Sequence, residues 1–188
     1  MPRPRSDDKR AAIMSAAARV IASQGLGAAT ATIAKEAGVS NGSLFTYFDT
    51  KADLLNQLYL ELKTDMGAAA LGGLADGGDV REQLLHMYSR WLRWATAYPH
   101  KRRALAQLEV SDEITQPTHK AASQALTGIA EILERSRENG PMRDAPLVFV
   151  VALANAIADT TIDFILRDPD NADTHSRAGF DALWRMIA

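Results

Sequence analysis

Apolar residues recur at the spacing of an α-helix along almost the whole chain of 188 residues, and no segment shows the sustained alternation of a half-buried strand. This pattern predicts an all-α fold of about nine helices, whose bounds follow from residues that favour helix ends. The expected helices cover residues 7–24, 30–37, 41–48, a segment capped by Asp49 or Thr50 that ends near Ala70, and then 80–97, 101–110, 118–138, 145–167 and 172–187. The glycine-rich stretch 72–78 is expected to be the main flexible link.

The composition is ordinary for a globular protein, with 47% hydrophobic and 23% charged residues. Because the chain has no cysteine, disulfides, thiolate nucleophiles and cysteine-based metal sites are excluded. Residues 1–10 lack the apolar core of a secretory signal. The most apolar run, 145–158, is shorter than the ~20 apolar residues that a membrane span needs, and it contains Asn155. We therefore expect a cytoplasmic protein that does not enter a membrane.

Charge is distributed unevenly along the chain. Residues 1–51 carry seven Lys or Arg and four Asp or Glu residues, a net charge of +3. The rest carries 14 basic and 19 acidic residues, a net charge of −5, so the whole chain has a net charge of −2. This asymmetry indicates a basic module attached to an acidic body and favours a nucleic-acid partner for the module.

The most informative local pattern is a pair of short helices, 30–37 and 41–48, joined by a turn that contains Gly38. This arrangement is typical of a helix-turn-helix, whose second helix can enter the major groove of DNA. Small residues in the first helix allow a close approach, and Val39, Leu44 and Phe48 can bury the back of the second helix. Its outward face would then carry Asn41, Gly42, Ser43, Thr46 and Tyr47. An ordinary helical corner with a solvated face is the alternative interpretation.

Residues 30–54, with the sequence TATIAKEAGVSNGSLFTYFDTKADL, resemble the N-terminal helix-turn-helix signature of the TetR family of transcriptional regulators. Glycine, aromatic and lysine positions agree at fixed offsets. The resemblance covers about residues 6–55, and the remainder is similar to the family only in its helix pattern. It implies a DNA-binding domain at residues 1–50 and a helical effector-binding and dimerisation domain at residues 51–188.

The resemblance also implies roles for single residues. Base contacts fall to Asn41, Gly42 and Ser43, and phosphate contacts to Thr30, Tyr47 and Lys51. Phe45 stands where the family usually has tyrosine, so an apolar contact, for example with a thymine methyl group, replaces a hydroxyl contact. Ala29 stands where threonine is frequent, which leaves Thr30 as the hydroxyl of that helix start. The candidate DNA-binding residues are Thr30, Asn41, Gly42, Ser43, Phe45, Thr46, Tyr47 and Lys51.

The helix at 80–97 carries a wider apolar surface than one core-facing stripe requires. Core packing explains each residue singly, but two tryptophans, a tyrosine and two methionines together can line an apolar cavity, and the resemblance implies an effector site between the central helices. A polar stripe in the helix at 145–167 is either its solvated edge or a wall of this cavity. The candidate effector-binding residues are Met66, Met87, Tyr88, Trp91, Trp94, Asn155, Asp159 and Asp163.

The helices at 145–167 and 172–187 carry more apolar surface than a monomer easily hides. The resemblance implies that this pair, the eighth and ninth of the expected helices, forms a homodimer interface. The four histidines lack the spacing of metal ligands, and no nucleotide-binding or hydrolase motif is present. We therefore expect no catalytic residue, metal or cofactor.

Together these observations predict a dimeric regulator, a repressor that a small-molecule effector releases from double-stranded operator DNA. One alternative is a DNA-binding regulator without a ligand, whose cavity is only core. The other is an all-α enzyme or interaction module in which the helical hairpin has no DNA-binding role.

Overall fold

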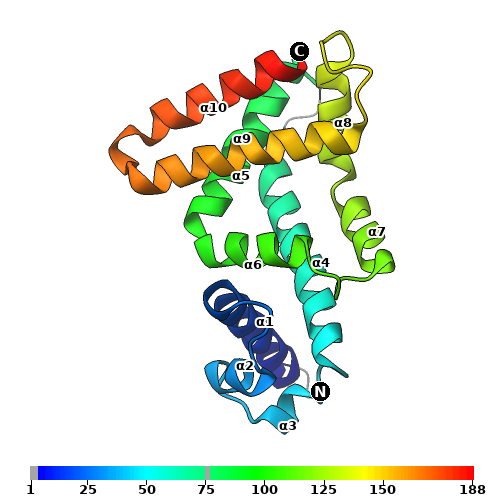
Figure 1. Cartoon of the computed structure of the whole chain (residues 1–188), viewed down its shortest axis with the longest axis vertical. Coiled ribbons are helices and arrows are strands. Elements are labelled where there is room, and N and C mark those ends of the chain that lie inside the picture. Colours follow the sequence, from blue (N-terminus) through cyan, green and yellow to red (C-terminus); the bar gives the residue numbers. More distant parts are fainter. Residues whose placement is uncertain (1–3, 75–76) are drawn as a thin grey trace. The chain divides into compact units, whose positions relative to one another are not determined.

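The computed structural model describes the backbone of residues 4–74 and 77–188, and the side chains of residues 7–74 and 77–188. These residues form ten α-helices and one short 3-10 helix, and no strand occurs among them (Figure 1). The all-α prediction is therefore confirmed. The elements are α1 (Pro4–Gln24), α2 (Thr30–Glu36), α3 (Asn41–Leu44), α4 (Lys51–Leu71), α5 (Val80–Ala97), α6 (Pro99–Glu109), α7 (Gln116–Ala125), α8 (Thr127–Arg137), α9 (Leu147–Arg167), η1 (Pro169–Asn171) and α10 (Ala172–Ile187).

The expected bounds of two helices, 118–138 and 41–48, are wrong. The single helix at 118–138 is two helices, because Leu126, with φ −106° and ψ 12°, leaves the helical conformation between α7 and α8. The helix at 41–48 ends at Leu44. There Thr46 N–H donates to Ser43 O at 3.1 Å and Tyr47 N–H to Leu44 O at 3.0 Å, so tighter three-residue turns replace the α-helical pattern. The expected bounds of α5 and α10 are confirmed.

The chain divides into two compact units. Unit 1 runs to Thr64 and includes Tyr98–Gln124, and unit 2 consists of Asp65–Ala97 and Ala125–Ala188. The expected functional boundary after residue 50 coincides with the start of α4, whereas the boundary between the units lies within that helix. The division into a DNA-binding and an effector-binding domain stays a prediction about function.

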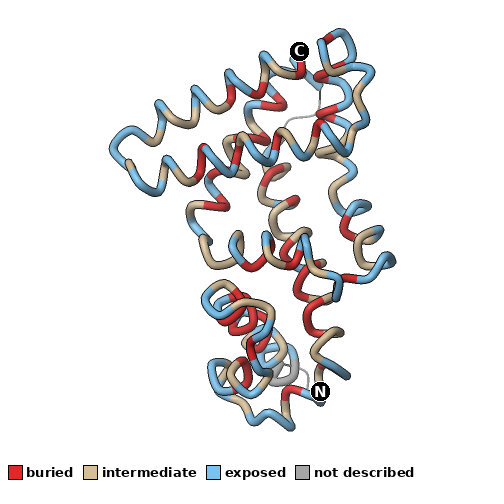
Figure 2. The backbone as a smooth tube through the Cα atoms, in the orientation of Figure 1, coloured by how far each residue is buried: buried red, intermediate tan, exposed pale blue. Residues whose placement is uncertain are grey.

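In unit 1, the core forms where α1 packs against α2 and α6. The buried face of α1 includes Ile13, Ala17, Val20 and Ile21, and buried residues recur along this helix in Figure 2. Gly25 ends α1 with a positive φ of 83°, a conformation that glycine adopts without steric strain because it has no Cβ. Beside it, Gln107 of α6 donates a side-chain hydrogen bond to Ile21 O at 3.2 Å.

A polar cluster joins the other helices of unit 1. The buried Tyr59 of α4 donates its hydroxyl proton to Glu109 Oε2 at 3.2 Å and lies 3.3 Å from His119 Nδ1 on α7. Lys63 Nζ pairs with the same carboxylate at 2.6 Å. Burial, with Glu109 as a second cause, raises the pKa of Tyr59, so its hydroxyl stays neutral.

In unit 2, α5 packs against α8, α9 and α10, and α9 and α10 lie side by side (Figure 1). Phe180, Leu183 and Ile187 of α10 are buried in this packing. Gly179 is needed for it, because an added Cβ would lie 2.2 Å from Thr161 Oγ1 and 2.4 Å from the Tyr88 hydroxyl.

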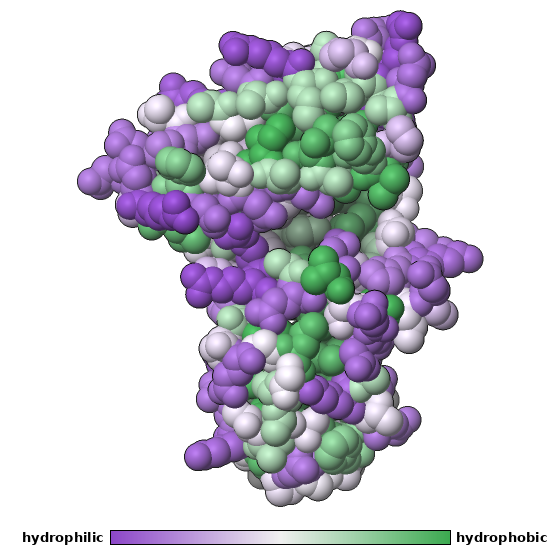
Figure 3. Space-filling view, viewed as in Figure 1, coloured by the Kyte–Doolittle hydropathy of each residue, from purple (hydrophilic) through white to green (hydrophobic). Residues whose placement is uncertain are grey.

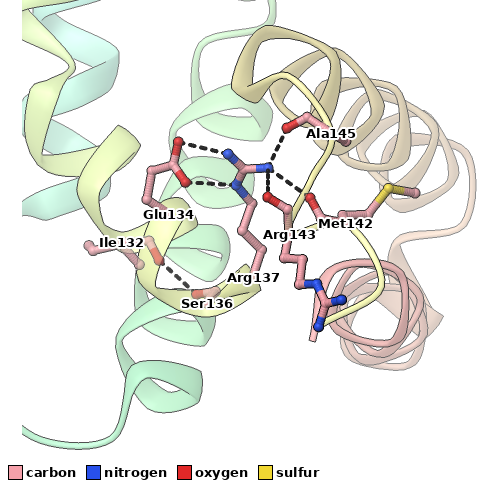
Figure 4. A network of polar contacts seen from close by, with 7 residues as sticks. All are labelled: Ile132, Glu134, Ser136, Arg137, Met142, Arg143 and Ala145. Carbon is pink, nitrogen blue, oxygen red and sulfur yellow. Dashed lines mark hydrogen bonds and ion pairs between the residues drawn. The ribbon is translucent and has the colours of Figure 1, made fainter. Parts of the chain in front are cut away.

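The segment between α8 and α9 is held by Arg137, which is only 7% exposed (Figure 4). Its Nε and Nη2 donate to the two carboxylate oxygens of Glu134 at 2.8 and 2.9 Å. Its Nη1 donates to the carbonyl oxygens of Met142, Arg143 and Ala145. One guanidinium thus closes the loop, and its hydrogen bonds lower the pKa of the Glu134 carboxyl.

The helix α9 keeps an apolar face exposed. Val148, Phe149, Phe164 and Leu166 are 77%, 51%, 50% and 42% exposed, and hydrophobic side chains gather over α9 and α10 (Figure 3). Among the described residues, α9 is the one helix long and apolar enough to cross a membrane by length and composition, which corrects the sequence estimate that it falls short. One such helix is weak evidence for a span. Its exposed residues include Asn155 and Asp159, which hydrocarbon does not accommodate cheaply.

Candidate nucleic-acid interface

The turn between α2 and α3 has the geometry of a helix-turn-helix. Gly38 adopts a φ of +70°, and Val39 N–H reaches back to Ala34 O at 2.9 Å, which closes the end of α2. Ser40 then caps α3, because its Oγ accepts the Ser43 N–H at 3.0 Å. Where the two helices face each other, the side chains of Ile33, Ala34 and Leu44 are buried. The polar sides of both helices therefore point outward.

The structure places the candidate DNA-binding residues along one short stretch of backbone, with Thr30 apart from it at the first residue of α2. Because α3 stops at Leu44, Phe45, Thr46 and Tyr47 lie in the turn that follows it rather than on a helix. Asn41, Gly42, Phe45 and Thr46 are exposed, whereas Thr30, Ser43, Tyr47 and Lys51 are half-buried. The Thr46 hydroxyl donates its proton to Ser43 O at 2.7 Å, so toward a ligand it can only accept a hydrogen bond.

The corner that leads into α4 is built from its own side chains. Thr50 Oγ1 accepts the Asp53 N–H at 3.0 Å, so Thr50, one of the two expected caps, is the cap. Asp53 Oδ2 in turn accepts the Asp49 N–H at 3.1 Å, so the pair of Thr50 and Asp53 satisfies two backbone N–H groups, one on each side of Lys51. Lys51 is the first residue of α4 and lies directly beside this pair.

Sequence reasoning did not single out Arg10 of α1. Its Nη2 donates to Gln57 Oε1 at 2.9 Å, its Nη1 lies 3.4 Å from Glu61 Oε2, and its guanidinium lies 5.7 Å from the centre of the Phe48 ring. All three partners are far away in the sequence, and one more cation in a basic segment carries no local signal. The contact with Phe48 brings α1 to the end of the helix-turn-helix.

Comparison with known proteins agrees with this geometry. Residues 13–58 match the family model described as bacterial regulatory proteins, tetR family. A tetR family transcription regulator from Shewanella sp. PV-4 is 28% identical, with a TM-score of 0.82 over 94% of this chain and 96% of that chain. Residues 13–58 are thus identified as a helix-turn-helix domain of the TetR type, and the chain as a whole is similar to TetR-family regulators. A TetR-family transcription regulator from Marinobacter aquaeolei VT8 has the same fold, with 22% identity and a TM-score of 0.86 over 97% of this chain and 96% of that chain.

A third TetR-like structure was solved with a ligand. It is the transcriptional regulator FadR from Bacillus subtilis in complex with stearoyl-CoA, 19% identical, with a TM-score of 0.69 over 95% of this chain and 99% of that chain. At this identity the likeness shows the fold alone.

In unit 2, the candidate effector residues differ in exposure. Met87, Tyr88 and Trp94 are buried, and Met66 and Trp91 are half-buried. Trp94 Nε1 donates to Asp65 Oδ2 at 3.1 Å, and Tyr88 donates to Thr161 Oγ1 at 2.9 Å. Burial raises the pKa of Tyr88, which keeps this donor neutral.

The polar stripe on α9 is placed differently from the aromatic residues. Asn155 and Asp159 are exposed and Asp163 is half-buried. A cavity of about 210 Å³ lies beside the link between α4 and α5, and none of the candidate effector residues lines it. Its lining is Gly73, Leu74, Gly77, Gly78, Asp79, Glu82, Gln83 and His86. Among the described side chains, no group of three His, Asp or Glu residues is spaced to hold a metal ion.

Proposed function

We propose that this protein is a homodimeric repressor of the TetR type that binds palindromic operator DNA through α2 and α3 and leaves it when a small-molecule effector binds. The observation that carries the proposal is the exposed polar and aromatic surface from Asn41 to Thr46, which Lys51 borders at the start of α4. Such a regulator acts where the DNA is, so a cytoplasmic location is part of the proposal.

The roles of the DNA-binding residues follow from their exposure and chemistry. Asn41 and Ser43 offer hydrogen bonds to base edges, and Gly42 lets the backbone approach closely. Phe45 exposes 41% of its surface, and such an exposed phenyl ring suits the methyl group of thymine. Thr30 and Tyr47 supply hydroxyl groups for phosphates, and Thr46 accepts hydrogen bonds from base amino groups.

Lys51 is supported by an electrostatic argument. A cation in the first turn of a helix opposes the helix dipole by about 0.3–1 kcal/mol, so its position does not serve helix stability. The same position suits a phosphate, because the helix end and the ammonium group then attract one anion together.

The exposed apolar face of α9 supports the homodimer. Together with α10 it forms the pair that corresponds to the eighth and ninth expected helices. Covering Val148, Phe149 and Phe164 with a second copy removes apolar area from water at about 25 cal/mol per Å². Two copies would then read half-sites about one turn of DNA apart or somewhat more, for which ~34–36 Å is the usual spacing. The exposure of Asn155 and Asp159 favours this face or solvent over the effector cavity for both side chains.

An apolar or amphipathic effector is supported by the aromatic residues and methionines of unit 2. Met66, Met87, Tyr88, Trp91 and Trp94 offer apolar surface with few charges. The effector would bind the DNA-incompetent state more tightly, and ~1–3 kcal/mol of coupling lowers operator affinity roughly 5- to 150-fold. The helix α4 is continuous from Lys51 to Met66, so a displacement at one end can reach the other.

Selection of genomic DNA fragments with the purified protein tests the DNA-binding part. We expect recovery of a palindromic site whose affinity falls steeply with salt. Failure to bind any duplex, or binding that does not depend on salt, overturns the proposal.

A compound library then tests the effector. A true effector quenches tryptophan fluorescence and releases DNA together, and Trp91→Ala abolishes both responses. Ligands that bind and never change DNA affinity favour a regulator without an effector.

A further inference from the structure

Arg10 is a cation of the basic N-terminal segment, yet its half-exposed guanidinium makes contacts with other residues of unit 1. One nitrogen donates to Gln57 Oε1 at 2.9 Å and another lies 3.4 Å from Glu61 Oε2. The guanidinium carbon stands 5.7 Å from the centre of the Phe48 ring, and Phe48 is 1% exposed. A planar guanidinium can make these contacts at once, whereas a lysine ammonium cannot reproduce both the fork and the stacking.

The contacts of Arg10 continue to the corner before α4. Gln57 Nε2 donates to Asp53 Oδ1 at 2.9 Å, and the other oxygen of Asp53 accepts the Asp49 N–H at 3.1 Å. Thr50 caps α4 from the same corner. We call the side chains of Arg10, Gln57 and Asp53 the corner relay. It runs from α1 along α4 to the backbone between Tyr47 and Lys51.

We propose that Arg10 is a positioning residue for operator binding. Through the corner relay and the Phe48 ring it fixes the backbone that presents Tyr47 and Lys51, and it makes no phosphate contact of its own. The inference rests on the proposed DNA-binding function and deepens it, because it assigns one of the basic residues of the N-terminal segment to contacts within the protein rather than to the DNA. Hydrogen-bond geometry at phosphates is lost over a few tenths of an ångström, so an unfixed corner weakens binding without removing a charge contact.

Salt dependence separates positioning from direct contact. The logarithm of the binding constant falls with the logarithm of salt concentration by about 0.9 for each phosphate that the protein neutralises. We expect Arg10→Ala and Arg10→Lys to weaken operator binding roughly tenfold, the effect of about one lost charge-assisted hydrogen bond, with the wild-type slope. Lys51→Ala, which removes a proposed phosphate contact, should flatten the slope by about 0.9.

Two further variants keep the test sharp. Gln57→Ala breaks the corner relay and leaves the cation and Phe48 in place, so it should also weaken binding with an unchanged slope, and its combination with Arg10→Ala should be less than additive. Arg103→Ala removes an exposed charge from α6 of the same unit and should bind like the wild type. Thermal unfolding of each variant identifies any loss that is due to misfolding, and Arg10→Lys then decides the question.

Wild-type affinity in Arg10→Lys with a flattened slope in Arg10→Ala overturns the inference, because Arg10 is then a direct phosphate contact. Wild-type affinity in Arg10→Ala also overturns it. Wild-type protein that binds no duplex overturns the proposed function itself, and this result differs from both.

Discussion

The hydroxyl of Tyr88 on α5 donates a hydrogen bond to Thr161 Oγ1 on α9 at 2.9 Å, and Gly179 of α10 packs directly onto this pair. A methyl group at position 179 would lie 2.2 Å from Thr161 Oγ1. We therefore predict that Gly179→Ala lowers the free energy of unfolding by about 1–3 kcal/mol, since α10 must shift or the pair must separate. Chemical denaturation measures the effect. Gly27→Ala is the control, because a Cβ there meets nothing within 4 Å. Equal stability of the two variants contradicts the packing described.

Removal of the Arg137 side chain should be among the most damaging changes in unit 2. Arg137→Ala leaves the carbonyl groups of Met142, Arg143 and Ala145 without their donor and Glu134 without its bidentate partner. We predict a clear loss in the free energy of unfolding, because three carbonyl groups lose their donor at once. The matched control is Arg143→Ala, whose side chain is 64% exposed and pairs only with Asp144. Its effect should stay within about 0.5 kcal/mol.

His100 should make the protein less stable in mild acid. Burial, and secondarily the charges of Arg19 and Lys101, lower the pKa of His100 below its ordinary value of 6.5. As the pH falls below 6.5, the unfolded chain takes up the proton first, so the free energy of unfolding decreases until His100 is protonated in the folded state as well. Comparison of the wild type with His100→Asn between pH 7.5 and 5 tests this. The variant should lose less stability over that range, and an equal loss refutes the assignment.

Disruption of the exposed face of α9 should prevent dimerisation without unfolding the monomer. Phe149→Asp together with Phe164→Asp places two carboxylates on a surface that is half exposed in one chain. Sedimentation should report monomers, and operator affinity should fall because one half-site remains. Leu183 of α10 is unsuitable for this test because it is 2% exposed and belongs to the core of its own unit. Leu85→Asp, at an exposed site on α5, is the control. A monomeric wild type at micromolar concentration rules out the dimer.

Base and phosphate contacts should respond differently to operator changes. Asn41→Ala should lose ~1–3 kcal/mol at particular base pairs and relax the preference there. Lys51→Ala should weaken all sequences alike. A panel of single-base operator variants measured against both proteins by fluorescence anisotropy makes the comparison. A uniform loss with Asn41→Ala would assign that side chain to the backbone of the DNA.

Local signals in the sequence predicted most helix ends correctly. The bounds of α5 and α10 and the Gly38 turn follow from capping and breaking residues within a few positions. The break at Leu126 was missed because no proline marks it. Close by, a Cβ added at Gly128 would lie 3.0 Å from Leu71 Cδ1, a proximity that only the folded chain defines.

The candidate DNA-binding residues could likewise be predicted from local sequence, whereas the placement of the α9 residues could not. The outward residues of the helix-turn-helix follow from the apolar residues that must face inward. Which face of α9 carries Asn155 and Asp159 could not be read, because the helix is apolar on most sides and its packing partners are distant in sequence. The role of Arg10 could not be predicted for the same reason, because its partners Gln57, Glu61 and Phe48 are distant in the sequence.

The closed loop between α8 and α9 has a consequence for how two copies would meet. Since Arg137 holds the carbonyl groups of Met142, Arg143 and Ala145 within a single chain, the first turn of α9 has its shape before any partner arrives. Association would then pay little ordering entropy at this end of the interface. Dilution of the proposed dimer should accordingly release folded subunits, and the dissociation constant should be measurable apart from the unfolding transition.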